Sequence, residues 1–387
     1  MYKILTLNNI SVKGLDSFPR DHYEIASEMS HPDGVLVRSY NMHDMVLSDD
    51  LKAIGRAGAG VNNIPVEAMS ERGVAVFNAP GANANAVKEL VMAGMLIAAR
   101  NLCAAWDYSR KLDATAPDLE QQVEAGKKRF VGSELPGRIL GVIGLGAIGV
   151  QVANSARALG MEVIGYDPKI LVRSALQLSS DVQHSASVDE VLTRADFVTF
   201  HVPLNDNTRH MINADRLARM KPGAVLLNFA RAEIVDEEAV CRALDSRQIH
   251  SYVCDFPTPR LLAHPKVVAL PHLGASTQEA EENCAVIVAG QLREYLEHGN
   301  VRNSVNLPEV FLPRAGDSRL TVIFRNLPDM VGQITHVLGK SGLNIVHMVN
   351  ESRGAVAYTI MDVEGDITED TAREIVATNG VLRVRVL

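Results

Sequence analysis

The chain has 387 residues, which predicts two or three domains, and its composition is ordinary for a globular protein. The net charge of −8, with no basic run to offset it, argues against a nucleic-acid-binding surface. The four cysteines form no CxxC pair, so neither a metal site nor a disulfide framework is expected. Reduced thiols and the lack of a signal-peptide pattern at the N-terminus predict a cytoplasmic location and no membrane partner.

Short apolar runs alternate with helical patterns through residues 1–271, which predicts two blocks of the doubly wound, parallel-sheet type. In the block of residues 1–101, we expect strands at 3–7, 34–39, 52–61 and 73–80, and a long helix from about residue 83 to 111. In the block of residues 102–271, we expect strands at 138–146, 161–167, 195–203, 223–231, 250–256 and 266–271.

The chain after residue 271 is expected to return to the first block. A helix that ends near Gly299 could carry it there, so that residues 272–310 complete the first domain. Residues 304–318 have the prolines and polar residues of a linker, and residues 318–387 follow a β-α-β-β-α-β pattern. The predicted fold is therefore α/β, with two doubly wound (Rossmann-like) domains and a C-terminal ferredoxin-like domain.

Three glycines follow the apolar run that ends near residue 143, in the spacing GxGxxG at Gly144, Gly146 and Gly149. They permit a tight turn, a close approach of the backbone to a pyrophosphate and close packing of helix on strand. Asp167 ends the next apolar run, where its carboxylate can bind both ribose hydroxyls and would repel a 2′-phosphate. The sequence therefore favours NAD over NADP. The alternative is a glycine-rich turn that binds no ligand.

Two residues have the chemistry that hydride transfer from a hydroxy acid requires. Arg231 follows an apolar run and carries a planar fork suited to a carboxylate, although it could instead be a surface arginine paired with Glu233 or Asp236. His272 also follows a run, and an imidazole can exchange a proton in both directions near neutral pH. His201 is a rival, but its place in the nucleotide block favours contact with the cofactor.

Several of these stretches resemble the D-2-hydroxyacid dehydrogenases, namely 141–149 with 166–168, 201–213, 220–240 and 270–285. "VRS" at 37–39, "GRAGAGVNNI" at 55–64 and "NAPGANANAVKELV" at 78–91 are similar to the D-3-phosphoglycerate dehydrogenase branch of that family. The C-terminal residues resemble an ACT regulatory domain. The resemblance implies NAD-dependent oxidation of 3-phosphoglycerate to 3-phosphohydroxypyruvate, the entry to serine synthesis.

The resemblance also implies a role for each matching position. Arg231 would bind the substrate carboxylate and His272 would be the proton donor or acceptor, while Asp255 would hydrogen-bond the nicotinamide carboxamide. The remaining substrate-binding positions would be Arg38, Arg56, Ala59 and Gly60, of which the two arginines would lie near the phosphate. The full set expected at the cofactor is Gly144, Gly146, Ala147, Ile148, Gly149, Asp167, His201, Val202, Pro203, Phe229, Ala230, Arg231, Asp255, His272 and Gly274.

The chain departs from the family at one point. Many members carry a glutamate, paired with the catalytic histidine, a few residues after the aspartate that ends the strand. Here no carboxylate occurs between Asp255 and Glu279. Since a paired carboxylate favours the imidazolium form, we expect the pH–rate profile to lie lower than in members that have the pair.

The C-terminal domain could bind an effector or serve only in assembly. Asn326 and Asn344 match the asparagines that bind serine in some relatives, whereas Phe324 stands where some of these have a histidine. The terminal strand could pair edge to edge in a homodimer or homotetramer. Two alternatives to the leading function stay open, a dehydrogenase for another D-2-hydroxy acid and an NAD(H)-sensing co-regulator without turnover.

Overall fold

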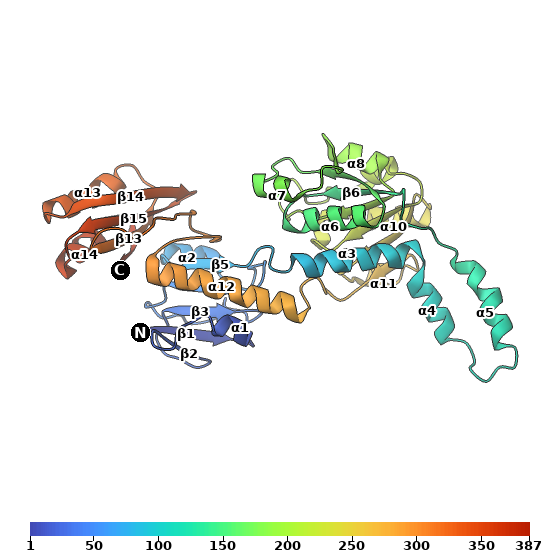
Figure 1. Cartoon of the computed structure of the whole chain (residues 1–387), viewed down its shortest axis with the longest axis horizontal. Coiled ribbons are helices and arrows are strands. Elements are labelled where there is room, and N and C mark those ends of the chain that lie inside the picture. The colour runs from blue at the N-terminus through green and yellow to red at the C-terminus, as the bar shows by residue number, and fades with distance from the viewer. The chain divides into compact units, whose positions relative to one another are not determined.

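The computed structural model describes all 387 residues, which fold as two compact units (Figure 1). Residues 1–83 and 278–387 form the first unit, and residues 84–277 form the second. The first unit contains a parallel sheet and a small antiparallel sheet, and the second unit contains one larger parallel sheet. The α/β class with two doubly wound parallel sheets is therefore confirmed.

The first sheet has five strands, all parallel, in the order β2-β1-β3-β4-β5. Their bounds are Tyr2–Leu7 (β1), Tyr23–Ala26 (β2), Gly34–Val37 (β3), Ala53–Arg56 (β4) and Ala75–Asn78 (β5). Three of the five lie within the expected stretches, and β1 begins one residue before its own. The edge strand β2 was not expected, because its four residues, YEIA, are too few to show a strand pattern.

Three helices accompany this sheet, α1 (Val12–Leu15), α2 (Val66–Glu71) and the long α12 (Gln278–His298). The buried face of α12 includes Cys284, Val288 and Leu292, which belong to the same hydrophobic core as Leu36 of β3. Gly299, with φ of +74°, follows the last residue of the helix. Helix α12 thus packs on the sheet of the first unit.

The sheet of the second unit has seven parallel strands in the order β12-β11-β10-β9-β6-β7-β8. Their bounds are Ile139–Ile143 (β6), Glu162–Tyr166 (β7), Gln183–His184 (β8), Phe197–Phe200 (β9), Ala224–Asn228 (β10), Ile249–Cys254 (β11) and Val267–Ala269 (β12). The strand order reverses between β6 and β9, and ligands of such sheets bind outside the carboxyl ends of the strands at this point.

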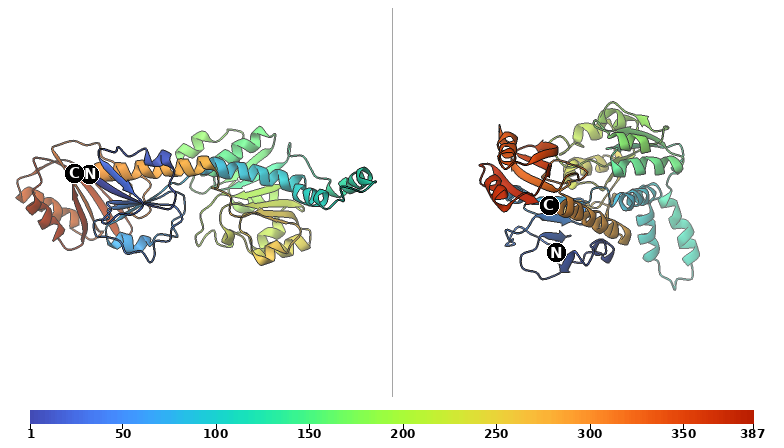
Figure 2. Two further views of the ribbon diagram at one scale, coloured as in Figure 1. Left: turned by 90° about the horizontal axis from the view of Figure 1, so that it is seen from below. Right: turned by 60° about the vertical axis from the view of Figure 1, so that its left-hand side comes forward.

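The helices of the second unit are α3 (Ala84–Ala99), α4 (Leu102–Arg110), α5 (Leu119–Lys127), η1 (Lys128–Phe130), α6 (Ala147–Ala158), α7 (Val172–Gln177), α8 (Val188–Arg194), α9 (Ala214–Arg219), η2 (Ala232–Ile234), α10 (Glu237–Asp245) and α11 (Pro259–Leu262). Figure 2 shows α4 and α5 as a helical hairpin that stands away from the sheet of this unit.

The single long helix expected at 83–111 is wrong, because the chain breaks between α3 and α4. Asn101 adopts a left-handed conformation with φ of +51°, and the two helices meet at 67°. No single helix of the chain has the length and hydropathy needed to cross a membrane, and this bent pair meets those two criteria only when it is taken together.

The C-terminal sheet is antiparallel, in the order β14-β15-β13-β16. Its elements follow one another as β13 (Ser318–Arg325), α13 (Met330–Lys340), β14 (Asn344–Arg353), β15 (Val356–Glu364), α14 (Glu369–Val376) and β16 (Val381–Val386). The ferredoxin-like pattern expected from residue 318 onward is therefore confirmed.

A buried ion pair joins the C-terminal sheet to α12. Nε and Nη2 of Arg319 donate to the two carboxylate oxygens of Asp362 at 2.6 and 2.7 Å, and Nη1 donates to the main-chain oxygen of His298. Both charged side chains are fully buried. Burial alone would raise the pKa of Asp362, but the hydrogen bonds from Arg319 and Ala315 outweigh it and hold that pKa below its usual value.

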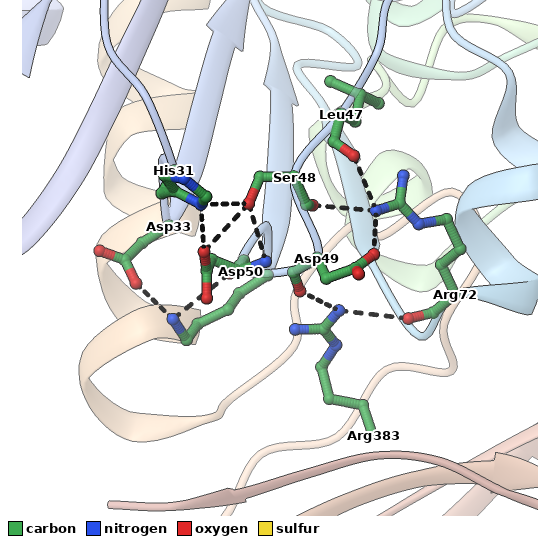
Figure 3. Close-up of polar contacts among 9 residues, drawn as sticks. His31, Asp33, Leu47, Ser48, Asp49, Asp50, Arg72 and Arg383 are labelled. Carbon is green, nitrogen blue, oxygen red and sulfur yellow. Dashed lines mark hydrogen bonds and ion pairs between the residues drawn. The ribbon is translucent and has the colours of Figure 1, made fainter.

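A second polar cluster joins β16 to the loops of the first sheet (Figure 3). Arg383 of β16 donates to the main-chain oxygens of Asp49 and Arg72. The Arg72 guanidinium in turn donates to the main-chain oxygens of Leu47 and Ser48 and pairs with the Asp49 carboxylate. The C-terminal sheet is thus packed on the rest of the first unit through charged as well as apolar groups.

Residues 304–318 do not form the free linker that their composition predicted. Ser304 bridges to Phe77 of β5, and the Val305 N–H donates to the main-chain oxygen of Val76. The side chain of Asn306 bonds the main-chain N–H of Val76 and the oxygen of Val74. Residues 304–306 therefore lie along the edge strand β5, where the Asn306 side chain and the Val305 N–H bond main-chain groups that have no further strand as partner.

Candidate active site

The glycine loop lies at the point where the strand order of the second sheet reverses. Gly144 has φ of +95°, and a Cβ there would lie 2.5 Å from the main-chain oxygen of His201, which follows β9. A Cβ on Gly149 would lie 1.9 Å from the oxygen of Gly144. Only glycine therefore permits both the turn and the close packing of α6 on β6.

Gly146 is different, because a Cβ built on it meets no atom within 4 Å. It is the N-cap of α6, and no side chain caps the free N–H groups of this twelve-residue helix. An open space beside uncapped N–H groups at a helix N-terminus is suited to a pyrophosphate. Ala147 and Ile148 form the first turn of the helix, so the residues present fit the expected dinucleotide.

Asp167, which follows β7, is held by main-chain groups. One carboxylate oxygen accepts the N–H of Leu145 at 2.9 Å, and the other accepts the N–H of Lys169 at 2.9 Å. A carboxylate has further lone pairs on both oxygens, so these bonds fix its orientation without using its capacity to accept ribose hydroxyls. The Asp167 carboxylate can therefore still bind the ribose hydroxyls of a dinucleotide that has no 2′-phosphate.

His201 is unsuited to proton transfer at neutral pH. Burial lowers its pKa to about 3, and its Nε2 lies 3.1 Å from the hydroxyl of Thr199. The imidazole therefore stays neutral over the physiological range. With Val202 and Pro203 it follows β9 beside the glycine loop, which agrees with contact to a cofactor rather than with acid–base chemistry.

Arg231 lies in a turn that a buried asparagine holds. Nδ2 of Asn228 donates to the main-chain oxygen of Arg231 at 2.9 Å, and Oδ1 accepts the N–H of Ala230 at 3.2 Å. Asn228 is fully buried at the end of β10. We did not single it out from the sequence, although a polar residue that ends the apolar run "AVLL" was the available signal.

The Arg231 side chain is exposed and forms no ion pair with Glu233 or Asp236. Its Nη1 donates only to the main-chain oxygen of Ala230, while Asp236 caps α10. The alternative, a surface arginine paired with Glu233 or Asp236, is therefore wrong. A guanidinium that has most of its donors unused can bind a carboxylate in a bidentate manner.

His272 and Asp255 lie together at the carboxyl ends of β11 and β12. The main-chain N–H of His272 donates to the main-chain oxygen of Asp255 at 3.1 Å, and the ring of Phe256 lies edge-on to the imidazole with centroids 5.2 Å apart. The N–H of Gly274 donates to Oδ2 of Asp255 at 3.3 Å. The exposed His272 side chain is therefore carried on a loop fixed by main-chain bonds.

The four predicted substrate-binding positions other than Arg231 lie in the first unit. Nη2 of Arg38 donates to Oε1 of Glu281 on α12 at 2.5 Å, in an ion pair that the sequence did not suggest. The Arg56 guanidinium lies over Gly58, where a Cβ would be 1.9 Å from its Nη1. Burial raises the pKa of the Cys284 thiol, and the charges of Arg56 and Arg38 both act against that rise. Arg56 stands opposite Val37 in the register of β4 and β3, so the two arginines lie at neighbouring strand ends.

Ala59 and Gly60 follow Arg56 in a loop that is held by hydrogen bonds. Nδ2 of Asn78 donates to the main-chain oxygen of Ala59 at 2.6 Å, and the N–H of Ala79 donates to the oxygen of Gly58. The main-chain N–H groups of the loop are thereby held in place beside β4. Asn78 is a second supporting asparagine at a strand end that sequence reasoning missed.

The two candidate effector asparagines lie at opposite ends of the C-terminal sheet. Asn326 follows β13 next to Arg325, which pairs with Val356, and its side chain donates to the oxygen of Gly354. Asn344 pairs with Glu364 at the far end of β15. Eight residues of strand separate these ends, a distance of about 25 Å. One chain does not bring the two asparagines together.

The structure gathers no group of three or more His, Cys, Asp or Glu side chains that could hold a metal ion. Within the second unit, the groups with chemistry suited to the expected reaction are therefore Arg231, His272 and the glycine loop.

Comparison with known proteins identifies the family of the chain. The family model for the D-isomer specific 2-hydroxyacid dehydrogenase NAD-binding domain matches residues 92–274. The D-3-phosphoglycerate dehydrogenase of Methanocaldococcus jannaschii is 38% identical over 338 residues, which are 84% of this chain and 61% of that protein. This chain therefore spans about three fifths of the length of that relative.

Two further relatives match more of their own length. The D-3-phosphoglycerate dehydrogenase of Escherichia coli is 33% identical over 375 residues, which are 92% of this chain and 87% of that protein. The cofactor (NAD+)-bound structure of 3-phosphoglycerate dehydrogenase from Entamoeba histolytica is similar with a TM-score of 0.61 and 25% identity, covering 80% of this chain and 99% of that chain. The protein belongs to the D-isomer specific 2-hydroxyacid dehydrogenase family of NAD-dependent oxidoreductases, and residues 92–274 contain its NAD-binding domain.

Proposed function

We propose that the protein oxidises 3-phospho-D-glycerate to 3-phosphohydroxypyruvate with NAD, the first step of serine synthesis. The observation that carries the substrate is the pair of guanidinium groups, Arg38 and Arg56, at the neighbouring carboxyl ends of β3 and β4. Two cations at the carboxyl ends of neighbouring apolar strands suit a phosphate dianion. The names of the relatives from Methanocaldococcus jannaschii and Escherichia coli support the same substrate.

The roles of the reacting residues follow from their chemistry. Arg231 binds the substrate carboxylate through two parallel N–H donors and so orients the carbon that bears the hydroxyl. His272 takes the hydroxyl proton during oxidation and returns it during reduction. NAD supplies the acceptor for the hydride that leaves the same carbon. The alcohol thus loses one proton to the imidazole and one hydride to the cofactor, and becomes a ketone.

The cofactor would be held by the residues that fit it. The uncapped first turn of α6 would take the pyrophosphate and Asp167 the adenosine ribose. His201, Val202, Pro203, Phe229, Ala230 and Gly274 would line the remainder, and Asp255 would accept a hydrogen bond from the nicotinamide carboxamide. This last bond would fix which face of the ring is presented.

Regulation and assembly form a further part of the proposal. Since Asn326 and Asn344 lie about 25 Å apart in one chain, a single serine could touch both only if two C-terminal sheets lie side by side in opposite directions. We therefore expect any serine site that uses both asparagines to require a homodimer or homotetramer. Gel filtration with and without serine, on the wild type and on Asn344→Ala, would test this expectation.

The test of the catalytic roles compares His272→Asn with the wild type. The variant should lose at least about a hundred-fold in turnover of 3-phosphohydroxypyruvate, because the proton donor is gone, while NADH binding stays within a few-fold. Turnover is followed by NADH absorbance, and binding by NADH fluorescence. A wild type that binds NADH but reduces no keto acid would favour the co-regulator, and reduction confined to unphosphorylated acids would favour another D-2-hydroxy acid.

A further inference from the structure

The Arg231 turn is held from two sides by the amide of Asn228. Nδ2 donates to the main-chain oxygen of Arg231 at 2.9 Å, and Oδ1 accepts the N–H of Ala230 at 3.2 Å. A rotation of the amide by half a turn would place oxygen against oxygen and N–H against N–H, so only one orientation satisfies both partners. Asn228 is fully buried, so water does not replace either bond.

The guanidinium of Arg231 is tied to the same turn. Its Nη1 donates to the main-chain oxygen of Ala230 at 2.6 Å. Ala230 therefore accepts the guanidinium through its oxygen, while its N–H is held by Asn228. The amide of Asn228 thus fixes the residue on which the guanidinium rests, and Nε and Nη2 of Arg231 remain available for a carboxylate.

Tyr252 supports this amide from the neighbouring strand. It lies on β11 opposite Leu226 of β10, is 3% exposed and belongs to a hydrophobic core of the second unit. Its hydroxyl oxygen accepts a hydrogen bond from Nδ2 of Asn228 at 3.3 Å. Nδ2 therefore uses both of its hydrogens, one on Arg231 and one on Tyr252. The buried aromatic ring limits how far the amide can move.

We propose that Tyr252 and Asn228 are positioning residues for Arg231, and that together they hold its guanidinium in the orientation that binds the substrate carboxylate. The proposal rests on the proposed function, in which Arg231 binds that carboxylate. Neither positioning residue touches the substrate. A long side chain that is released from one orientation must be ordered again when the substrate binds, and the entropy lost in this ordering corresponds to about ten-fold in binding.

The first experiment measures the positioning without substrate. The Nε–H signal of Arg231 is followed by NMR relaxation in the full chain, and Arg231→Lys identifies this signal by its loss. The wild type should show the relaxation of an ordered side chain, whereas Asn228→Ala should show that of a mobile one. Tyr252→Phe, which removes a single oxygen atom, should give an intermediate value. Equal relaxation in the wild type and in both variants would overturn the proposal.

The second experiment is a double-mutant cycle with Arg231→Lys. With Arg231 present, Asn228→Ala should lower kcat/KM for the keto acid about ten-fold, through both a higher KM and a lower kcat. Tyr252→Phe should lower it about two- to three-fold, because one neutral hydrogen bond is lost. In the Arg231→Lys background, each change should cost less than about two-fold, because no guanidinium is left to position. A merely structural role would give equal losses in both backgrounds, and that result would overturn the proposal.

Ser251 provides a matched control on the same strand. It precedes Tyr252, is 8% exposed, and has a buried hydroxyl with no hydrogen-bond partner. Ser251→Ala should therefore change neither kcat/KM nor the relaxation of the Arg231 signal. A loss as large as that in Tyr252→Phe would show that any buried hydroxyl of β11 has this effect, and would overturn the proposal.

The same measurements cover the case in which Asn228→Ala does not fold. Tyr252→Phe then carries both experiments, because it keeps the aromatic ring and the packing of the core. A wild type that reduces no keto acid would overturn the proposed function. The relaxation of the Arg231 signal would then decide by itself whether Asn228 and Tyr252 position this side chain.

Discussion

The ion pair between Arg38 and Glu281 bears directly on the proposed phosphate site. A phosphate that binds Arg38 must displace the Glu281 carboxylate, which lies 2.5 Å from the Arg38 guanidinium. The Arg38 and Glu281 side chains are 36% and 40% exposed. Ion pairs with this exposure contribute about 0.2–1 kcal/mol, and 1 kcal/mol is a factor of about five. Glu281→Gln should therefore lower the KM for 3-phosphohydroxypyruvate about two- to five-fold, with kcat unchanged.

The neighbouring residue provides the control. Glu282 lies on the same helix and pairs with Lys13 at 2.5 Å, so Glu282→Gln should leave that KM unchanged. The assay is steady-state NADH absorbance, with unphosphorylated hydroxypyruvate as the second substrate, whose KM should not fall in Glu281→Gln. An equal fall for both acids, or a rise for the phosphorylated one, would refute the assignment of Arg38 to the phosphate.

Three further predictions follow from buried polar groups. Asn228→Ala leaves main-chain groups of the Arg231 turn unpaired and should destabilise the protein by about 1–3 kcal/mol in thermal unfolding, with a lower kcat. Asp362→Asn leaves Arg319 as a buried, uncompensated charge and should lower the free energy of unfolding by about 3–5 kcal/mol. Because the pKa of Asp362 is lowered in the folded state, the wild type should keep this full stability difference above about pH 4 and lose it as the pH falls through the folded-state pKa. Urea titrations at several pH values would measure it. His201, with its pKa near 3, stays neutral, so His201→Asn should not move the pH–rate limb between pH 5 and 9.

The sequence predicts local features of this fold well. The alternation of strand and helix patterns predicts the two parallel sheets, and the glycine spacing predicts the turn into α6. Both patterns can be read from residues that are close together in the sequence. The position of Arg231 and His272 after apolar runs was enough to place them at strand ends. Edge strand β2 was not predicted, because four residues are too few to show a periodic pattern.

Features that depend on distant contacts could not be predicted. The Arg38–Glu281 pair joins residues 243 positions apart, and nothing local to either residue indicates it. The break at Asn101 has no proline or glycine to mark it, since asparagine supplies the left-handed conformation. The separation of Asn326 from Asn344 follows from strand order in the C-terminal sheet, which a pattern of strands and helices does not give.

The most direct test of the proposed function is the rate of NADH oxidation by the purified protein with 3-phosphohydroxypyruvate and, separately, with unphosphorylated hydroxypyruvate. We predict a clear preference for the phosphorylated acid, and a rise in its KM of about ten-fold or more in Arg56→Ala, because a hydrogen-bonded ion pair to the phosphate is lost. Equal rates on the two acids, or a preference that survives Arg56→Ala unchanged, would contradict the assignment.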